Sequence, residues 1–390
     1  MKKRIMILLL ALLLAVSSTA AAVYDSYRVE LGDASYFVGW TFCPLDAHNA
    51  VVFARTDKEG KPWHVGWYRD GELFRDLAGY NANVYLEDRV IPRPVLWDGE
   101  TLTMGCSDRK GAYRTVVIDG LNCADPENYE DYFADWTENG LENRRPVPED
   151  WYEAQQLGRV MFSRENGTLS LWIDGKETAL PEAFLEIPPE LVFNLDCFPA
   201  GEERCLLSWR NDADSYQYIA CVDHGRMRSE VVLSMEDAWL IMPDADGGFL
   251  SQIGWNTGDY TPVSLAHYSA DGERDRVLQL KGDRVVVRAM HTVADGETGN
   301  VILYGTAVAQ SRYVYTAFAM TLDRDLNVTD LDVRNIDGAY RAYSPDLEIA
   351  PDGTAWLLIG DVDGKPAHRP VMIPFSALEK SNDDHGLTLE

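Results

Sequence analysis

The sequence lacks the motifs on which several common chemistries depend. It contains no Gly-x-Ser-x-Gly nucleophile elbow and no phosphate-cradling glycine loop. It also has no Cys-x-x-Cys pair and no cysteine and histidine run with zinc spacing, and its 7 histidines are scattered along the chain. Nothing in the sequence therefore points to a serine esterase, a nucleotide-dependent enzyme or a zinc protein.

Basic residues are scarce. The chain has 35 Lys and Arg against 63 Asp and Glu, which gives a formal net charge of −28 at pH 7. Such a charge repels a phosphate backbone or an anionic membrane surface. We therefore expect no nucleic-acid partner. The same charge would attract divalent cations or cationic ligands wherever suitable residues cluster to hold them.

Long apolar runs are missing beyond the N-terminus. A basic start at residues 2–4 is followed by the apolar run Ile5–Val16 and by small residues that end at Ala22. This is the layout of a secretory signal peptide. A retained membrane anchor is the alternative, but a bilayer span needs about 20 apolar residues. We expect cleavage after Ala22 and a secreted or extracytoplasmic protein that forms one domain over residues 23–390, with no membrane span.

The chain has 6 cysteines, all after the predicted signal peptide. An oxidising compartment permits disulfides between them. A hairpin centred on Ala213 would place Cys205 opposite Cys221, which makes these two a possible disulfide. A hairpin centred on Gly201 would instead place Cys197 opposite Cys205, so the two pairings compete. Buried free thiols are the third interpretation, because a free cysteine behaves as a small hydrophobic residue.

Short strand-like segments separated by tight turns recur along the chain. Asp-Gly dipeptides, which favour such turns, stand among other places at residues 98–99, 246–247, 295–296 and 352–353. Between residues 238 and 281 the pattern predicts four strands, at Trp239–Met242, Phe249–Trp255, Val263–Tyr268 and Val277–Lys281. Four strands in about 45 residues is the size of one β-propeller blade.

The second strand of this unit has counterparts along the whole chain. They begin near Ala50, Thr101, Gly158, Cys205, Phe249, Val301 and Ala355. In this respect the sequence resembles secreted β-propellers in general, without matching a particular subfamily. The resemblance implies an all-β fold with seven blades of four antiparallel strands, or with six or eight blades as alternatives. It does not imply an activity, because one fold carries many functions.

Closure of such a ring requires the first and last strands to share a blade, since an open edge would otherwise remain. We expect Tyr36–Thr41 to pair beside Trp356–Gly360 and Val371–Pro374.

One region, residues 124–157, differs from the repeat in composition because acidic and aromatic residues alternate in it. Tyr129, Tyr132 and Trp136 share one face of a helical pattern, so we expect a short helical or irregular insertion between blades. The insertion could pack its aromatic face on the side of the propeller. It could instead form an acidic and aromatic rim around a ligand, with Tyr129, Tyr132, Trp136 and Trp151 as binding candidates.

Calcium is the cofactor that the acidic residues suggest most readily. Asp323, Asp325 and Asn327 have the spacing that opens an oxygen-ligand loop. However, Val328 stands where such loops need glycine, and Arg334 stands where they need a closing glutamate. Aspartate also favours turns for conformational reasons. We therefore predict no cofactor and keep a structural calcium ion as the alternative.

These observations favour an exported binding module that recognises a glycan, a peptide or a partner protein on one propeller face. The alternative is a secreted glycosidase-like hydrolase that uses a carboxylate pair near the central channel, which would require two carboxyl groups about 5–10 Å apart. A third interpretation is an interaction protein of the cell envelope without a small ligand. The residues assign no catalytic group.

Overall fold

The computed structural model describes a chain that is nearly all β. The described residues are 24, 26–29, 37–56, 63–76, 93–107, 113–119, 151–155, 160–165, 168–173, 176–178, 192–200, 204–211, 216–254, 262–283, 285–295, 298–309, 314–336, 345–359 and 371–390. Apart from isolated helical positions near Tyr24, the described helical structure is the 3-10 helix η4 (Phe375–Ala377). None of the helical segments in these ranges is both long and apolar enough to cross a membrane. The signal-peptide prediction, with cleavage after Ala22, lies outside the described residues.

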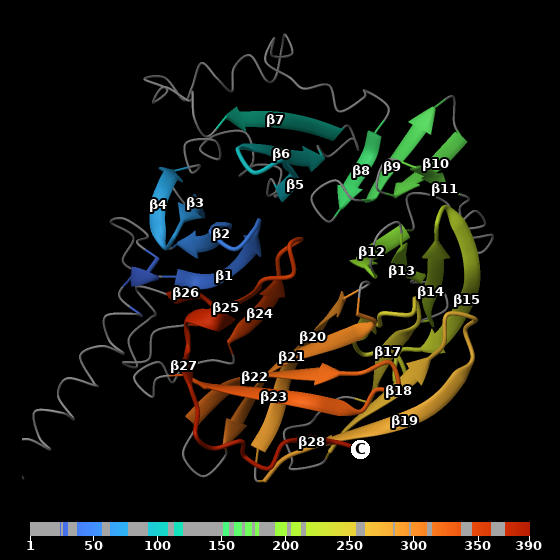
Figure 1. Ribbon diagram of the computed structural model, residues 1–390. Coiled ribbons are helices and arrows are strands. Elements are labelled where there is room, and N and C mark those ends of the chain that lie inside the picture. The colour runs from blue at the N-terminus through green and yellow to red at the C-terminus, as the bar shows by residue number, and fades with distance from the viewer. Residues whose placement is uncertain are drawn as a thin grey trace, which may run out of the picture. The chain divides into compact units, whose positions relative to one another are not determined.

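The described strands form seven sheets, which we number in chain order (Figure 1). The second strands of the sheets are β2, β6, β9, β13, β17, β21 and β25. Each begins within two residues of a start that the sequence predicts. The repeat and the all-β class are therefore confirmed by the described strands.

The chain divides into two compact units. Unit 1 comprises Met1–Ala78, Thr306–Phe318 and Asp332–Asp383, and unit 2 comprises Gly79–Gly305, Ala319–Leu331 and Asp384–Glu390. Sheets 1 and 7 belong to unit 1, sheets 2 to 5 belong to unit 2, and sheet 6 has residues in both.

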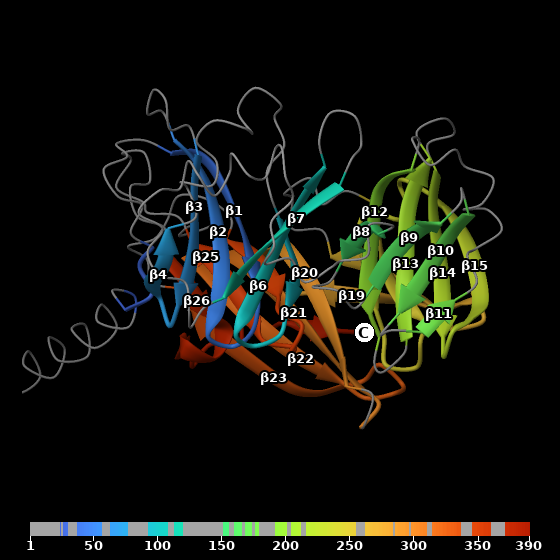
Figure 2. The same cartoon turned by 90° about the horizontal axis from the view of Figure 1, so that it is seen from above.

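Unit 1 contains the first and the last sheet of the chain. Sheet 1 consists of β1 (Phe37–Pro44), β2 (Asn49–Thr56), β3 (Trp63–Arg69) and β4 (Glu72–Asp76). Sheet 7 consists of β24 (Asp346–Ile349), β25 (Ala355–Ile359) and β26 (Val371–Pro374). The two sheets share one apolar core, in which Phe42 and Tyr68 of sheet 1 join Trp356 and Met372 of sheet 7. Figure 2 shows β25 and β26 beside β1, β2 and β3.

The edge of sheet 7 pairs with the N-terminal segment. Arg28 forms an antiparallel bridge with Val371, and the Met372 N–H donates to the Tyr27 carbonyl oxygen at 3.0 Å. The predicted partner, Tyr36–Thr41, was wrong. Residues 37–44 form β1, the edge strand of sheet 1, which pairs with β2 among the described strands, and the segment upstream of β1 pairs with β26 instead.

Gly71 is required where this N-terminal segment passes the β3–β4 turn. Its φ is +83°, and a Cβ atom there would lie 2.1 Å from the Ser26 carbonyl oxygen. Both the left-handed backbone and the close approach exclude a side chain.

Unit 2 contains sheets 2 to 5. Sheet 2 consists of β5 (Arg93–Trp97), β6 (Thr101–Ser107) and β7 (Tyr113–Asp119), and sheet 3 of β8 (Trp151–Gln155), β9 (Val160–Glu165), β10 (Thr168–Ile173) and β11 (Lys176–Thr178). Sheet 4 consists of β12 (Val192–Pro199), β13 (Arg204–Asn211), β14 (Tyr216–Asp223) and β15 (Arg226–Ser234). Sheet 5 consists of β16 (Ile241–Pro243), β17 (Phe249–Ile253), β18 (Val263–Tyr268), β19 (Arg274–Lys281) and the C-terminal β28 (Thr388–Leu389). Figure 2 shows the strands of sheet 4 side by side.

Sheets 4 and 5 pack against each other as consecutive members of the repeat. Leu206 and Ile219 of sheet 4 share an apolar core with Phe249 and Tyr268 of sheet 5. The Phe249 and Tyr268 rings stack with their centroids 4.7 Å apart, an arrangement that adds about 1 kcal/mol to the burial of their surfaces. This packing explains why the strands read as apolar on both faces.

Sheet 6 consists of β20 (Val285–Asp295), β21 (Asn300–Ala309), β22 (Val314–Leu322), β23 (Val328–Asn335) and β27 (Glu379–Lys380). The last segment of the chain thus adds a short outer strand to two sheets. In unit 1, β27 pairs with the end of β23, and in unit 2, β28 pairs with the end of β19.

The predicted disulfide between Cys205 and Cys221 is not formed, and both residues are free thiols. The β13–β14 hairpin pairs Cys205 with Val222 and Leu206 with Cys221, one residue away from the predicted register. A shift of one residue sends the two thiols to opposite faces of the sheet. The competing pair is absent as well, because Cys197 lies opposite Leu207.

The predicted insertion at residues 124–157 is wrong at its C-terminal end. Residues 151–155 form β8, which pairs with β9 and is the first strand of sheet 3. The sequence of residues 151–155 is compatible with a strand or with a loop. We expected a loop because acidic residues precede this segment. Residues 121–150 lie outside the described part of the chain.

Candidate functional site

The turn between the first two strands begins with an aspartate in five sheets. Each carboxylate accepts hydrogen bonds from backbone N–H groups two to four residues further along. These aspartates are Asp46, Asp98, Asp244, Asp295 and Asp352. Aspartate stabilises turns in this way. The repeated carboxylates therefore serve the fold, which explains the Asp-Gly dipeptides at Asp98, Asp295 and Asp352 without catalysis.

One of these aspartates also holds a buried histidine. Asp244 Oδ2 lies 2.7 Å from His267 Nε2, and Asp275 Oδ1 lies 2.6 Å from His267 Nδ1. Burial of the imidazole acts to lower its pKa, but the hydrogen bonds and charges of Asp244 and Asp275 outweigh burial and raise the pKa. The cluster joins the β16–β17 turn, β18 and β19. Since the ring fills the space between the two carboxylates, this pair is closed to a substrate.

The segment Asp323–Asn327, whose spacing suggested calcium as an alternative, is a tight turn between β22 and β23. Asp323 Oδ1 accepts hydrogen bonds from the Asp325 and Asn327 N–H groups at 3.0 and 2.8 Å, and the Asn327 amide also donates to the carboxylate. These hydrogen bonds, with that from the Asn327 side chain largest, hold the pKa of Asp323 below its usual value. The Asp-x-Asp-x-Asn spacing thus has a conformational explanation. In the described part of the chain no three His, Cys, Asp or Glu residues form a metal-binding group.

Asp346, at the start of β24, is a described acidic residue whose carboxyl pKa is raised. Its side chain reaches solvent, yet the protein atoms around it raise the pKa of its carboxyl. Burial is the only cause of this shift among the described residues. A glycosidase pair would add repulsion from a second carboxylate. Among the described residues, no second carboxylate contributes to the raised pKa of Asp346.

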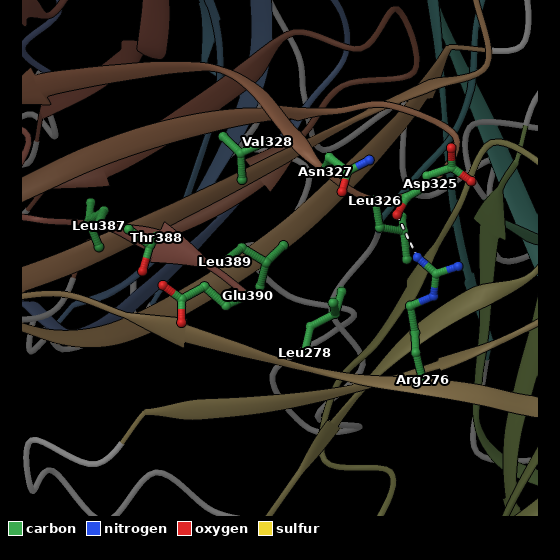
Figure 3. Close-up of a pocket in the computed structure, with 10 residues that line it drawn as sticks. All are labelled: Arg276, Leu278, Asp325, Leu326, Asn327, Val328, Leu387, Thr388, Leu389 and Glu390. Carbon is green, nitrogen blue, oxygen red and sulfur yellow. Dashed lines mark hydrogen bonds between the residues drawn. The ribbon is translucent and has the colours of Figure 1, made fainter.

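A pocket of about 430 Å³ lies within unit 2, where β19, the β22–β23 turn and the C-terminal segment meet (Figure 3). It is lined by Arg276, Leu278, Asp325, Leu326, Asn327, Val328, Leu387, Thr388, Leu389 and Glu390. Leucine side chains contributed by all three elements form its apolar part. Charged side chains stand at its rim, so the pocket combines apolar surface with sites for polar contacts.

Arg276 fixes one side of the pocket. Its guanidinium donates a hydrogen bond to the Asp325 carbonyl oxygen, marked in Figure 3. The Asp275 carboxylate lies 3.8 Å from the Arg276 Nε atom. The turn that Asp323 stabilises therefore positions the Asp325 carbonyl oxygen, which accepts the hydrogen bond from Arg276. In this way the residues with calcium-like spacing help to shape the pocket.

The C-terminal segment forms the opposite side. Its side chains alternate, because Leu387 and Leu389 are 5% and 8% exposed while Thr388 and Glu390 are exposed. Glu390 is held by Lys281, whose Nζ lies 3.0 Å from Oε2, and by backbone bonds to Gln279. In Figure 3, the side chain of Leu278 lies between those of Arg276, also on β19, and of Glu390 from the C-terminal segment.

None of the predicted binding residues is among the described residues that line this pocket. Tyr129, Tyr132 and Trp136 lie outside the described residues, so their binding role stays a prediction. Trp151 begins β8 opposite Ser163, and the position of its side chain is not among the described features. The sequence analysis did not identify the residues that line the pocket as a binding site. The Leu-x-Leu alternation at 387–389 was the available signal, but two residues are too few to define a strand.

No family model matches the chain, and no curated protein matches it. Among solved structures, the chain is similar to a post-proline cleaving enzyme from Rickettsia typhi, with a TM-score of 0.46 and 11% identity over 94% of this chain and 55% of that one. It is also similar to a bifunctional GH43-CE protein of Bacteroides eggerthii, with a TM-score of 0.31 and 12% identity over 77% of this chain and 34% of that one. The chain thus spans about half the length of the first protein. Neither score is high enough to carry an argument about fold or activity.

Proposed function

We propose that the protein is an exported β-propeller that acts as a binding module for a peptide, a glycan or a partner protein. The seven sheets would be its blades. Their order along the chain, their antiparallel pairing and the recurring aspartate turns support this architecture. Packing of sheet 1 on sheet 7, and of sheet 4 on sheet 5, supports it further, because consecutive blades of a ring pack face to face.

Export rests on the N-terminal pattern. Residues 1–22 combine a basic start, an apolar run and small residues that end at Ala22, which is the composition of a cleaved leader. The mature protein would then act outside the cytoplasm, where its excess of acidic residues favours solubility.

The observation that carries the binding role is the pocket beside β19. Its volume of about 430 Å³ lies within the range of ligand-binding clefts. Leu278, Leu326 and Leu389 supply apolar contact, while Arg276 and Glu390 offer a cation and an anion at its rim. Such a surface can select a ligand by shape and charge without chemical change.

The test is binding of the mature protein, residues 23–390, to glycan and peptide arrays with and without a chelator. We expect a ligand that wild type retains and that the variant Leu278→Arg loses, because the long cation would fill the pocket. Val232→Ala is the matched control, since Val232 is exposed on β15 and does not line the pocket. Turnover of an arrayed sugar, or equal binding by Leu278→Arg and wild type, would contradict the proposal.

A further inference from the structure

A β-bulge aims the Asp275 side chain at the buried ring of His267. His267 of β18 lies opposite Arg276 of β19. The next residue of β18, Tyr268, lies opposite Arg274, so Asp275 is the extra residue of the bulge. Bulges redirect side chains in this way. Asp275 Oδ1 lies 2.6 Å from His267 Nδ1 and 3.8 Å from Arg276 Nε. The carboxylate is therefore within hydrogen-bonding distance of the imidazole and just beyond it from the guanidinium.

The two carboxylates that hold the ring differ in their access to water. The Asp244 side chain is 6% exposed, whereas that of Asp275 is 42% exposed. Asp244 Oδ1 also accepts hydrogen bonds from the Asp246 and Gly248 N–H groups, which fix the carboxylate in the β16–β17 turn. A buried acceptor that loses its donor cannot replace it with water. Loss of the hydrogen bond to His267 therefore destabilises the protein more at Asp244 than at Asp275.

The protonation state of the ring decides how many carboxylates it can donate to. An imidazolium donates from both nitrogens, but a neutral imidazole donates from one and presents a lone pair at the other. Because the bond to Asp244 is the more important one, the neutral ring should keep its proton on Nε2. Its Nδ1 lone pair then faces Asp275 and repels the carboxylate, while the Arg276 guanidinium on the other side attracts it.

Neighbouring elements bring further charged or titratable groups to this cluster. Among the described residues these are Arg204 of β13, Cys221 of β14, Asp246 of the β16–β17 turn, Tyr268 of β18, Arg274 of β19, and Asp323 and Asp325 of the β22–β23 turn. Burial raises the pKa of the Cys221 thiol to about 11 and also raises the pKa of Tyr268, so both stay neutral near pH 7. Aspartates and arginines keep their charges there. His267 is therefore the group of this set whose charge changes first as the pH rises from 6.

We propose that Asp275 exchanges its partner when His267 titrates, and so links the proton on the buried ring to Arg276 at the wall of the pocket. While the ring is protonated, Asp275 holds the imidazolium, and Arg276 donates to the Asp325 carbonyl oxygen (Figure 3). When the ring releases its Nδ1 proton to water, the Asp275 carboxylate turns to Arg276 Nε and compensates its charge. The wall of the pocket thus presents a cation at low pH and an ion pair at high pH.

The direction of the pH dependence follows from the surroundings of the ring. Burial acts to lower the pKa of His267, but the hydrogen bonds and charges of Asp244 and Asp275 outweigh burial and raise the pKa above 6.5. The imidazolium therefore predominates below pH 6.5 and is lost as the pH rises through the folded-state pKa. The exchange of partners belongs to the protein alone, so it occurs whether or not the pocket binds a ligand.

The first test follows the His267 ring nitrogens and the Arg276 guanidinium by carbon-detected NMR of the mature protein between pH 5 and 10. Arg276→Lys assigns the guanidinium signal. We expect both groups to change with one midpoint above pH 6.5, and the ring to lose its proton from Nδ1. A guanidinium signal that stays constant while the ring titrates would overturn the proposal. So would a neutral ring that keeps its proton on Nδ1, because Asp275 would then keep its partner.

The second test removes the carboxylate charge with little change in shape. In Asp275→Asn we expect the pKa of His267 to fall by about one unit or more and the Arg276 signal to lose its transition. Asp271→Asn is the matched control, because Asp271 is an exposed aspartate of the β18–β19 turn whose ion pair is with Arg228. It should leave both midpoints unchanged. A transition of Arg276 that persists in Asp275→Asn would contradict the exchange.

The third test removes the titrating group. His267→Gln stays neutral at every pH, so its Arg276 signal should show no transition between pH 6 and 9. A transition at the wild-type midpoint would assign the pH dependence to another group and overturn the proposal. Circular dichroism checks that the variant folds, and if it does not, the comparison of Asp275→Asn with Asp271→Asn decides. Failure of the glycan and peptide arrays would remove the proposed ligand and leave these three measurements unaffected.

Discussion

His267 Nε2 lies 2.7 Å from Asp244 Oδ2, and this hydrogen bond ties the third strand of sheet 5 to the turn between its first two strands. The other ring nitrogen faces Asp275. A neutral imidazole can donate from only one nitrogen, so two carboxylate partners favour the protonated ring. This arrangement explains why the pKa of His267 is raised although burial of the ring opposes the change.

The first prediction concerns the pH dependence of stability. The folded-state pKa of His267 lies above the unfolded value of 6.5. Its stabilising contribution is therefore fully present below the unfolded pKa and is lost as the pH rises through the folded-state pKa. We expect His267→Gln to lower the free energy of unfolding by about 2 kcal/mol at pH 6, and by less at pH 9.

Urea unfolding between pH 6 and 9 measures this effect. His48→Gln is the control, because His48 also bonds an aspartate, Asp70, but both side chains are largely exposed. Exposed pairs contribute little to stability. If His267→Gln and wild type lose stability in parallel as the pH rises, the protonated cluster is not the source of the dependence.

The second prediction concerns the contact between sheets 1 and 7. The Trp356 indole N–H donates to the Asp46 carbonyl oxygen at 3.0 Å, and the Ala47 N–H donates to Asp352 Oδ2 at 2.8 Å. Trp356→Phe removes one of these bonds while keeping an aromatic ring in the core, and should cost about 1 kcal/mol. Trp356→Ala should cost about 3–5 kcal/mol, because the side chain is 0% exposed. Chemical denaturation distinguishes the two, and a Trp356→Phe variant as stable as wild type would show that the hydrogen bond contributes nothing.

The third prediction concerns the thiols of sheet 4. Burial raises the pKa of the Cys221 thiol to about 11, so little thiolate forms near neutral pH. Native protein should therefore be alkylated slowly at Cys221. In denaturant without reductant, Cys205 and Cys221 should both react fully, as peptide mapping by mass spectrometry would show. Protection of both residues in denaturant would instead reveal a disulfide between or to them.

The positions of the sheets could be read from the sequence because the repeats share an apolar second strand, and in five of the seven described sheets an aspartate turn precedes it. Phe249 after Asp244 and Ala355 after Asp352 are examples. The strand Val263–Tyr268 was predicted with its observed bounds. The aspartate turn predicts where a strand begins, and the apolar run predicts that the segment is a buried strand. Both signals therefore indicate the same position.

The pocket and the other long-range pairings could not be predicted in this way, because such pairings leave little trace in the sequence. Strands β27 and β28 have two residues each, too few to show alternation. The bridge between Arg28 and Val371 is shorter still. The register of the β13–β14 hairpin differed by one residue from the prediction, which was enough to separate Cys205 from Cys221. Long-range pairing and register depend on packing, which local pattern does not fix.

The fourth prediction separates turn chemistry from metal binding at Asp323. Asp323→Asn keeps a side-chain oxygen that can accept from the Asp325 and Asn327 N–H groups, whereas Asp323→Ala removes it. We expect Asp323→Ala to lower the melting temperature and to weaken binding at the pocket, because the Asp325 carbonyl oxygen that holds Arg276 would lose its support. Asp323→Asn should resemble wild type in both measurements. Calcium should leave all three melting temperatures unchanged, since the Asp323 carboxylate is already occupied by N–H donors. A calcium-dependent rise in wild type that Asp323→Asn abolishes would restore the metal interpretation, because the two side chains differ in charge and hardly in shape.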